Sequence, residues 1–382
     1  MTSVVAFRDE FPVTGRRTYL ISASLGPLSR RSRLLAEEHL DLWERLGPEE
    51  LWFDHGFPRL DECRSSFATL IGAAPHEIAI VSSVSAGLSS IASCLDFRLR
   101  PKVVLSALDF PTNHHVWLAQ RRRGARLDMA PSPDGIGVEA GQLTARIDGS
   151  TAIVNLNRVL YGSSWIMDVP PVVEAAHRDG ALVVLDDFHG TGTVPIDVHR
   201  LGVDFLLSGA LKWLCGGQGI AFLYVREGLI ESLEPTVVGW FGTQDPFSFG
   251  GSELRLRPDA GRFETGTYPL PQAWTALGGL ELILEVGVES IRAHSQALTG
   301  EIIRRADSLG LDVLSPRADE RRGGLVRLRM PGGQAGAQRI LHALLERDVV
   351  LDARGDALRI SPHFFNDDSD IDRCFTELQS LL

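Results

Sequence analysis

The sequence contains little cysteine, methionine or tyrosine, with only four of each among its 382 residues. The cysteines lie far apart and form no Cys-x-x-Cys pair; they are Cys63, Cys94, Cys215 and Cys374. A disulfide-stapled fold is therefore not expected, and no metal site is predicted. Isolated free thiols are typical of a reducing compartment, so we predict a cytoplasmic location.

Long hydrophobic runs are also missing, and positive charge is outnumbered. No apolar run approaches the roughly 20 residues that a membrane helix needs. The start MTSVVAFRDEF has no basic leader and carries acids early, unlike a signal peptide. Lysine and arginine number 38 against 49 acidic residues, which gives a net charge of −11. The sequence therefore predicts neither a membrane segment nor a surface for nucleic acid.

Short apolar runs with many β-branched residues recur along the first two thirds of the chain. They cover residues 77–83, 102–108, 125–131, 151–157, 181–187, 203–209 and 220–225. Such runs are typical of strands buried on both faces of a parallel sheet, and helical patterns separate them. We predict an α/β fold with a mainly parallel seven-stranded sheet flanked by helices, with ligands at the carboxyl ends of the strands.

The last third of the chain has a different pattern. Residues 229–268 are rich in glycine, proline and aromatics, residues 270–308 are helical in pattern, and short strands and helices follow. A chain of 382 residues exceeds one ordinary core. We predict a large α/β domain over residues 31–268 and a small α+β domain of residues 1–30 with 269–382.

Two strand ends carry residues that suggest cofactor chemistry. Lys212 follows the strand at 203–209 and precedes a glycine-rich turn, and the strand at 181–187 ends in Asp186, Asp187 and then His189. Burial disfavours the charged form of lysine, which suits Schiff-base chemistry. A lysine that holds an aldehyde and an aspartate that holds a pyridinium nitrogen indicate pyridoxal 5′-phosphate (PLP) as the cofactor.

With these motifs in view, the chain resembles the class V aminotransferase group of PLP enzymes, fold type I, and within it the kynureninase pattern. The kynureninase motif Lys-Tyr-Leu-Asn-Gly-Gly-Pro-Gly reads KWLCGGQG at 212–219, and Gly-Trp-Phe/Trp-Gly reads GWFG at 239–242. Phe-Pro-Thr-Asp reads FPTN at 110–113, and Asn-Ser-Leu-Gly reads ASLG at 23–26. The order and spacing of these pieces, from about Tyr19 to the C-terminus, carry the resemblance.

The resemblance implies roles around the cofactor ring. Lys212 would form the Schiff base and then move the Cα proton, and Asp186 would pair with the pyridinium nitrogen. Asp187 is the less suitable partner, because the family spacing Asp-x-x-His counts from Asp186. His189 would lie by the phenolic oxygen, and Phe110 would stack on the ring. The neighbouring histidines 114 and 115 are alternatives for that stacking place.

The resemblance also implies a phosphate site and a dimer. Val84 would offer its backbone N–H and Ser85 its hydroxyl at the start of a predicted helix, where the helix dipole favours an anion. Thr267 would complete the phosphate site from the neighbouring subunit, and Trp240 matches the indole donor of kynureninases. Both imply a homodimer with its active sites at the interface. Arg359 matches the arginine that grips the substrate carboxylate.

Several positions depart from the kynureninase pattern. Leu211 replaces the tyrosine directly before the lysine, which helps protonation during Cβ–Cγ cleavage, and Ala23 replaces an asparagine. Gly209 stands where relatives often have a serine for the phosphate, although Ser208 could substitute. Arg158 stands near the predicted phenolic oxygen, where relatives often have asparagine, and could alter the electronics of the cofactor or bind a second acidic group on the substrate.

We therefore predict a PLP-dependent enzyme that acts on a small amino acid as a Cβ lyase, by carbon–sulfur or carbon–carbon cleavage. The alternatives are a class V aminotransferase, a decarboxylation-dependent deaminase, and a PLP-fold protein that only binds. A cysteine desulfurase is disfavoured, because residues 346–359 contain no cysteine nucleophile. A nucleotide-binding α/β protein is disfavoured too, because neither GxGxxG after the first strand nor GxxxxGK[ST] occurs.

Overall fold

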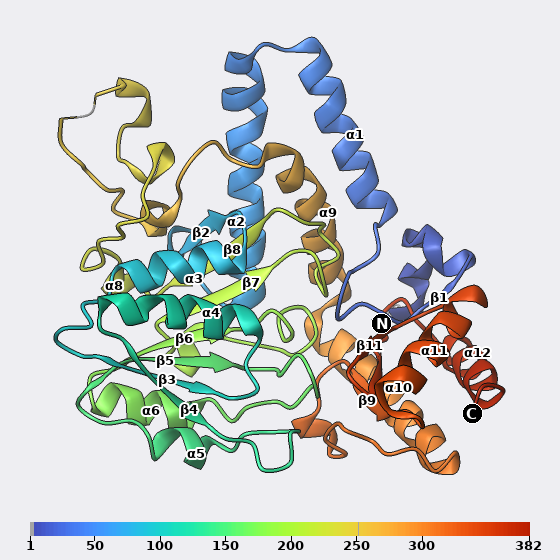
Figure 1. Cartoon of the computed structure of the whole chain (residues 1–382). Helices are drawn as coiled ribbons and strands as arrows, with labels where there is room; N and C mark the ends of the chain where they lie inside the picture. Colours follow the sequence, from blue (N-terminus) through green and yellow to red (C-terminus); the bar gives the residue numbers. More distant parts are fainter. Residues whose placement is uncertain (1–3, 251) are drawn as a thin grey trace.

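The structure of the chain is a computed structural model that describes residues 4–250 and 252–382. A seven-stranded sheet lies at its centre, in the order β2-β8-β7-β6-β5-β3-β4 (Figure 1). The strands are β2 (Ile78–Val81), β3 (Lys102–Ser106), β4 (Arg126–Ala130), β5 (Thr151–Asn157), β6 (Leu182–Asp186), β7 (Phe205–Gly209) and β8 (Ala221–Val225). Only β8 runs antiparallel to its neighbours. The predicted mainly parallel α/β fold is therefore confirmed.

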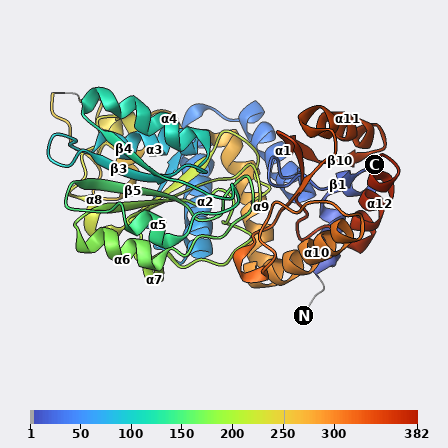
Figure 2. The same cartoon turned by 60° about the horizontal axis from the view of Figure 1, so that its bottom comes forward.

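Both faces of this sheet are buried, because successive side chains of a strand point to opposite faces. Val183 and Leu185 of β6 lie in one hydrophobic core, and Val184 between them lies in the other. The first core is covered by α2 (Phe57–Ile71), α6 (Pro170–Arg178) and α9 (Leu270–Val286), and the second by α3 (Val84–Ser93) and α4 (Pro111–Ala119). Figure 2 shows α3 and α4 on one side of the strands and α6 on the other. Burial on both faces explains why the strands read as continuous apolar runs.

The remaining helices before residue 231 lie in the connections between strands or project beyond the sheet. Short helices α5 (Ala140–Thr144), α7 (Val198–Leu201) and α8 (Glu227–Ile230) belong to the connections. α1 (Arg30–Arg45) begins after Ser29, whose hydroxyl accepts a hydrogen bond from the Ser32 N–H at 2.9 Å. α1 and α2 extend beyond the sheet as a helical pair (Figure 1). None of the helices within residues 4–250 and 252–382 is both long and apolar enough to cross a bilayer.

A second, three-stranded antiparallel sheet lies in the C-terminal part, in the order β11-β12-β9. Its strands are β9 (Val326–Arg329), β11 (Asp352–Arg354) and β12 (Ala357–Ile360), and α10 (Val288–Ser308), α11 (Gly333–Glu346) and α12 (Asp368–Gln379) pack on it in a third hydrophobic core. The start of the chain joins this part, because β1 (Thr18–Tyr19) pairs with β10 (Val349–Val350).

These contacts support the proposed small domain of residues 1–30 with 269–382, beside a large domain of residues 31–268. One element crosses that division. α9 belongs to the small domain by residue number, yet it packs on α1 and α2 in the first core of the large sheet. Its last residues lead through Gly287, at φ 82°, directly into α10. α9 therefore connects the core of the large sheet to the C-terminal part.

Candidate active site

Lys212 lies in the loop between β7 and β8, beyond the carboxyl end of β7, where the chain reverses direction. The Gly216 N–H donates to the Ala210 carbonyl at 2.8 Å and closes the loop. Gly26 of the ASLG motif passes so close that a Cβ there would lie 2.1 Å from the Lys212 carbonyl oxygen. Its N–H donates to the Leu211 carbonyl at 2.8 Å. The N-terminal motif therefore supports the lysine loop by a close approach that only glycine allows.

The Lys212 amine is surrounded by aromatic rings. Its Nζ lies 2.7 Å from His189 Nε2, 4.3 Å from the ring centre of Phe188 and 5.5 Å from that of Phe110. Burial lowers the pKa of Lys212 to about 8, against the opposing effect of Asp186. The neutral form that a nucleophile for an aldehyde needs is therefore far more populated near physiological pH than in an ordinary lysine.

His189 is buried, and burial together with the Lys212 charge lowers its pKa. It is therefore a neutral imidazole at physiological pH. Its Nδ1 has no hydrogen-bond partner among the described residues. A buried ring nitrogen without a partner is costly, so this edge of the imidazole is able to bond a ligand.

Asp186 and Asp187 have different surroundings. Asp187 accepts two hydrogen bonds from Arg158, at 2.7 and 2.8 Å, and a third from the Thr191 hydroxyl at 2.7 Å. Among the described residues, the Asp186 carboxylate accepts only from the Phe188 N–H at 3.1 Å and from Asn113 Nδ2 at 3.0 Å. No cationic side chain of the described chain lies at ion-pair distance from Asp186. The geometry thus leaves Asp186, and not Asp187, free to pair with a cationic ligand atom.

Arg158 is not brought into the group around Lys212. Besides Asp187, its guanidinium donates to the Pro195 and Val194 carbonyls, both at 2.8 Å. The side chain is buried, and its donors are directed at these partners of its own chain. A contact with a second acidic group of the substrate was the expectation for Arg158, and this geometry gives that expectation no support.

Two asparagines complete the surroundings of Asp186. Asn157 Oδ1 accepts from the Phe110 N–H at 3.1 Å and from Asn113 Nδ2 at 3.0 Å. Asn157 ends β5 and lies in register beside Asp186 at the end of β6. The two asparagines therefore fix both the carboxylate and the backbone at Phe110.

The starts of two helices meet where the phosphate was predicted. Ser85 lies in the first turn of α3 and Thr112 in the first turn of α4, with their hydroxyl oxygens 3.2 Å apart. Val84 opens α3 after the N-cap Ser83, whose hydroxyl accepts from the Ala86 N–H. Free N–H groups at the start of a helix favour an anion.

Phe188 explains the glycine that stands in place of a family serine. A Cβ on Gly209 would lie 2.4 Å from Phe188 Cζ, so the ring occupies the room that a side chain would need. Ser208, the possible substitute, is fully buried in β7. Phe188 therefore takes this room and also forms one side of the Lys212 surroundings.

Arg359 lies on β12, across the hairpin from Asp352 on β11. Its Nε donates to Asp352 Oδ1 at 2.7 Å, and its Nη2 donates to Oδ2. Further bonds join it to the Ser24 hydroxyl at 2.9 Å and to the Tyr161 carbonyl at 2.6 Å. Asp352 binds the Nε–Nη2 edge of the guanidinium, so a substrate carboxylate would use the remaining Nη1 donor or displace one of these partners.

Two predicted residues are not brought to Lys212 within one chain. Trp240 packs among Trp52, Phe241 and Phe247, and its indole N–H donates to the Pro246 carbonyl. Thr267 is exposed and lines a cavity of about 190 Å³ together with Ser82 and with Ala86, Ser89 and Ser90 of α3. Neither makes a hydrogen bond to Lys212, Asp186 or His189 in the described part of the chain.

None of the cysteines resembles a nucleophile. Burial raises the pKa of Cys63, Cys94 and Cys374 to about 12 and raises that of Cys215 as well. Cys215 has a left-handed backbone with φ 51°. The kynureninase motif has asparagine there, and asparagine tolerates that conformation well. Cys215 is therefore a turn residue of the lysine loop.

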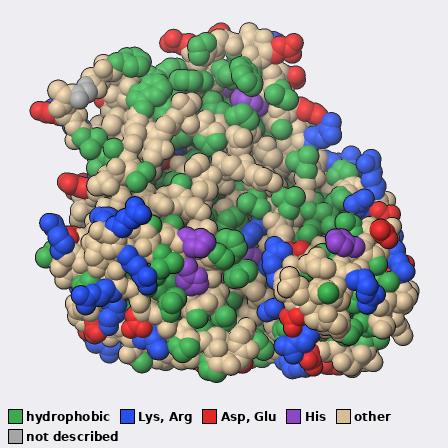
Figure 3. All heavy atoms as spheres, viewed as in Figure 1, with side chains coloured by type: hydrophobic (Ala, Val, Ile, Leu, Met, Phe, Trp, Pro, Cys, Tyr) green, Lys and Arg blue, Asp and Glu red, His purple; other side chains and the backbone are tan. Residues whose placement is uncertain are grey.

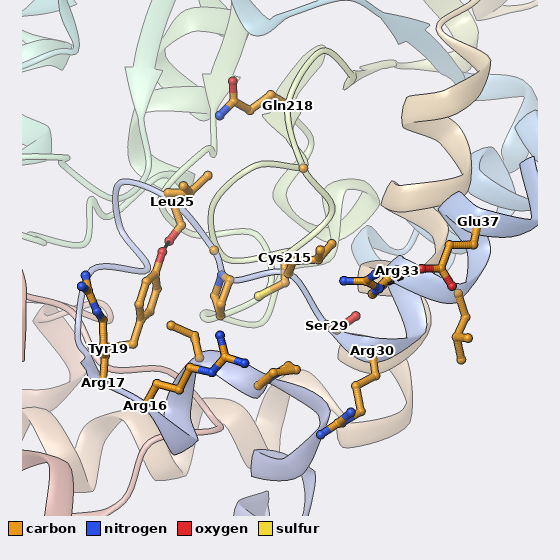
Figure 4. A pocket seen from close by; sticks show the side chains of 17 residues that line it. Arg16, Arg17, Tyr19, Leu25, Ser29, Arg30, Arg33, Glu37, Cys215 and Gln218 are labelled. Carbon is orange, nitrogen blue, oxygen red and sulfur yellow. Dashed lines mark hydrogen bonds and ion pairs between the residues drawn. The ribbon is translucent and has the colours of Figure 1, made fainter. Parts of the chain in front are cut away.

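A cavity of about 1150 Å³ lies beside the lysine loop, on the side away from the sheet (Figure 4). Its wall comprises residues 12–19 in part, residues 25–37 in part, and Cys215, Gly217 and Gln218. Leu25, Leu28 and Leu34 in this wall are exposed. Apolar side chains and arginines thus share this surface next to the candidate active site.

The residues present fit PLP. Among the described residues, Asp186 is a buried carboxylate without a cation and His189 Nδ1 is a buried donor or acceptor without a partner, and Lys212 is a partly buried amine of lowered pKa. A pyridinium N–H, a phenolic oxygen and an aldehyde would satisfy these three groups in turn. Ser85 and the N–H groups at the start of α3 provide a place for the phosphate.

Sequence reasoning missed several members of this site, which are Ser24, Asn113, Asn157, Tyr161, Phe188 and Asp352. Asn113 and Asn157 could have been found, because both stand in motifs at predicted strand ends. Asp352 could have been found from the hairpin register, because the two-residue turn at 355–356 places it opposite Arg359. Phe188 carries no chemical signal in the sequence.

Comparison with known proteins gives the following relationships. The family model for class-V aminotransferases matches residues 57–373. An uncharacterized aminotransferase of Bacillus subtilis (strain 168), YcbU, is 30% identical over 372 residues, which are 97% of this chain and 96% of the relative. A kynureninase of Geobacillus thermodenitrificans (strain NG80-2) is 30% identical over 374 residues, 93% of this chain and 86% of the kynureninase. A solved variant of C-DES, with glycine covalently linked to its PLP cofactor, shares the fold with a TM-score of 0.88 at 21% identity, covering 97% of this chain and 98% of that one.

Proposed function

The chain belongs to the class-V aminotransferase family, and on that premise we propose that it is a Cβ lyase acting on a small amino acid. It is a PLP-dependent enzyme of fold type I. The finer assignment, cleavage of a carbon–sulfur or carbon–carbon bond at Cβ, rests on the group of residues around Lys212 and on the likeness to kynureninases.

The proposed roles follow the surroundings of each side chain. Lys212 binds the cofactor aldehyde, Asp186 holds the pyridine nitrogen, Phe110 covers one ring face, and His189 bonds the phenolic oxygen. Val84 and Ser85 hold the phosphate. When bound, PLP stabilises negative charge at Cα of an amino acid. The carboxylate of Asp186, fixed by Asn113, keeps the ring nitrogen protonated for that task.

Lys212 and Arg359 have different proposed roles toward the substrate: Lys212 transfers a proton, and Arg359 binds the carboxylate. The lowered pKa of Lys212, about 8, leaves its amine able to take the Cα proton and to return it. Arg359 orients the amino acid by its carboxylate, with Asp352 and Ser24 holding the guanidinium in place. Arg158 has no proposed contact with substrate, because Asp187 and two carbonyls take up its donors.

The observation that carries the lyase assignment is the position of Phe110. Its ring centre lies 5.5 Å from Lys212 Nζ, which supports its proposed stacking on the cofactor ring. Kynureninases use phenylalanine in that role, and many other class V enzymes use histidine. A kynureninase is also a relative over nearly the whole chain. A cysteine desulfurase needs a thiolate near the carboxylate arginine, whereas β11 and β12 are joined here by a tight turn without cysteine.

An aminotransferase is the second candidate, because Lys212 and Asp186 suffice for transamination and YcbU carries that name. The decarboxylation-dependent deaminase was suggested by the unusual Arg158, which is engaged with Asp187. We therefore do not carry that alternative further.

A visible absorbance spectrum with product analysis tests the proposal. The purified enzyme is mixed with cysteine conjugates, kynurenine and common amino acids. A lyase releases pyruvate or alanine with the leaving fragment and keeps the aldehyde form of its cofactor. Accumulation of the pyridoxamine form, with a keto acid that retains the whole side chain, would instead identify an aminotransferase.

We also propose a cytoplasmic homodimer whose sites draw on both subunits. Trp240 and Thr267 do not reach Lys212 in one chain, and apolar side chains gather at the top of the molecule (Figure 3), over the region of α1, α2 and the loop residues 237–250 and 252–254. The exposed residues there include Leu34, Leu40, Trp43, Phe53, Phe249 and Leu254. An apolar surface of this kind favours a protein partner.

Mixing two inactive variants tests the shared site. A Lys212→Ala subunit paired with a Thr267→Ala subunit regenerates one intact site if Thr267 serves the neighbouring subunit. Activity that appears only after the two variants exchange subunits supports the proposal. A mixture of exchanged subunits that stays inactive would place Thr267 in its own subunit or outside the site. Light scattering of the wild type supplies the oligomeric state.

A further inference from the structure

The site lacks an acid at the position where kynureninases have one. Leu211 stands directly before Lys212 and has no proton to give. Cleavage at Cβ nevertheless ends with an electron pair on an atom that needs a proton. Lys212 is occupied with the Cα proton, and His189 is a neutral, buried imidazole. The proton comes either from the Lys212 ammonium that forms when the Cα proton is taken, or from a second acid near Cβ.

Tyr161 is the one tyrosine of the four in contact with this site. Its ring meets Phe110 edge to face, with centres 5.1 Å apart and planes at 90°, and lies 6.5 Å from His189. Its carbonyl accepts from Arg359 at 2.6 Å. Tyr161 therefore joins two parts of the site: its ring contacts Phe110, and its backbone carbonyl holds Arg359.

The other tyrosine hydroxyls are used elsewhere or buried elsewhere. Tyr19 donates to the Leu25 carbonyl at 2.9 Å, Tyr268 donates to Glu264, and Tyr224 is fully buried in β8. The hydroxyl of Tyr161 makes no hydrogen bond to any residue in the described ranges. The side chain is partly exposed, so its hydroxyl is free for a substrate.

We propose that Tyr161 is the general acid that protonates the leaving group at Cβ, in place of the tyrosine that Leu211 replaces. This inference rests on the lyase function proposed above. In a cysteine S-conjugate the Cβ–S bond breaks, sulfur keeps the electron pair and takes the phenolic proton, and a thiol leaves. Water returns a proton to the phenolate. Overall, one conjugate and one water give the thiol, pyruvate and ammonium, so no oxidant or reductant is needed.

The test compares two leaving groups in wild type and Tyr161→Phe holoenzyme. S-methylcysteine has a basic leaving group that needs an acid, whereas S-(nitrophenyl)cysteine releases a stable thiolate without one. General acid catalysis contributes roughly 100-fold or more. We expect Tyr161→Phe to lower kcat by about that factor for the methyl conjugate and by only a few-fold for the nitrophenyl conjugate.

A binding measurement that involves no bond cleavage, together with a control variant, separates the acid role of Tyr161 from a packing role. The dissociation constant of glycine, measured by its effect on the absorbance of the cofactor, should be unchanged in Tyr161→Phe. Tyr19→Phe, whose hydroxyl serves only Leu25, should cleave both conjugates like the wild type. Equal losses for both conjugates, or no loss for either, would overturn the assignment of Tyr161. A wild type that cleaves neither conjugate, nor kynurenine, would overturn the lyase function itself and the acid role with it.

Discussion

Asp352 holds Arg359 by two parallel hydrogen bonds, from Nε at 2.7 Å and from Nη2, across the hairpin of β11 and β12. The arginine proposed to bind the substrate carboxylate therefore already binds a carboxylate of its own chain. The Asp352 carboxylate is stabilised in return: burial alone would raise its pKa, but the Arg359 bonds outweigh this effect and lower it. The pair presents a guanidinium of fixed orientation to the site.

Arg359→Lys keeps the charge but loses the planar fork. Hydrogen bonds to charged groups contribute about 1.5–3 kcal/mol each, so we expect KM for amino acids to rise about 10- to 100-fold while kcat changes little. Steady-state kinetics measure this. Arg329→Lys, a half-exposed change on the neighbouring strand, serves as the control. An unchanged KM in Arg359→Lys would mean that the carboxylate binds elsewhere.

Replacement by asparagine should affect mainly the stability at Asp187 and mainly the activity at Asp186. Asp187→Asn leaves the buried Arg158 without its counter-charge, which costs about 3–5 kcal/mol of folding free energy. Asp186→Asn keeps the hydrogen bonds but loses the charge for the ring nitrogen, so activity should fall by about 100-fold or more with little change in stability. Denaturant unfolding and kinetics on both variants check this. The assignment fails if Asp186→Asn retains wild-type activity.

The burial of Lys212 predicts a pH-dependent stability in cofactor-free protein. The pKa of Lys212 in the folded protein, about 8, lies below the ordinary value of 10.5. Below pH 8, folding therefore either removes the proton from this amine or buries its positive charge, and both lower the stability of the folded state. Lys212→Met should therefore be more stable than the wild type at pH 7, by about 1–3 kcal/mol. The difference should shrink as the pH rises from 8 to 10.5. A stability difference that is flat over this range would contradict the burial of a titrating amine.

The cysteines should play no part in turnover. Their raised pKa values keep them protonated, and three of the four are buried. Iodoacetamide at neutral pH should therefore leave the activity of the folded enzyme unchanged. Mass spectrometry of unfolded protein, which should take up four labels, is the control for reagent activity. Inactivation that follows modification of a single cysteine would revive a thiol mechanism.

The large sheet was predictable because burial on both faces leaves a direct trace in the sequence. Each of its seven strands lies within a predicted run, as Ile78–Val81 lies within 77–83. The short apolar segment at 349–354 is different, because it divides into Val349–Val350 and Asp352–Arg354, which belong to different sheets. The first piece pairs with Thr18–Tyr19, more than 300 residues away. A pairing of two residues has too little local pattern to be seen without the fold.

The candidate site was predictable where chemistry requires a residue type, as at Lys212 and Asp186. It was less predictable where packing decides. Phe188 fills the space beside Gly209, and Arg158 is neutralised by Asp187, and neither relation follows from spacing along the chain. Tyr161 lies in the segment NRVLYG, of which only Arg158 was predicted to contact the site.

Ser24 and Gly26 give the beginning of the chain an influence on the active site. Ser24 shares Arg359 with Asp352, and Gly26 supports the loop of Lys212. Deletion of the first 26 residues would remove both contacts together with the strand Thr18–Tyr19. Protein engineers who trim or fuse this end would therefore be altering substrate recognition, even though no cofactor-binding residue is proposed before Val84.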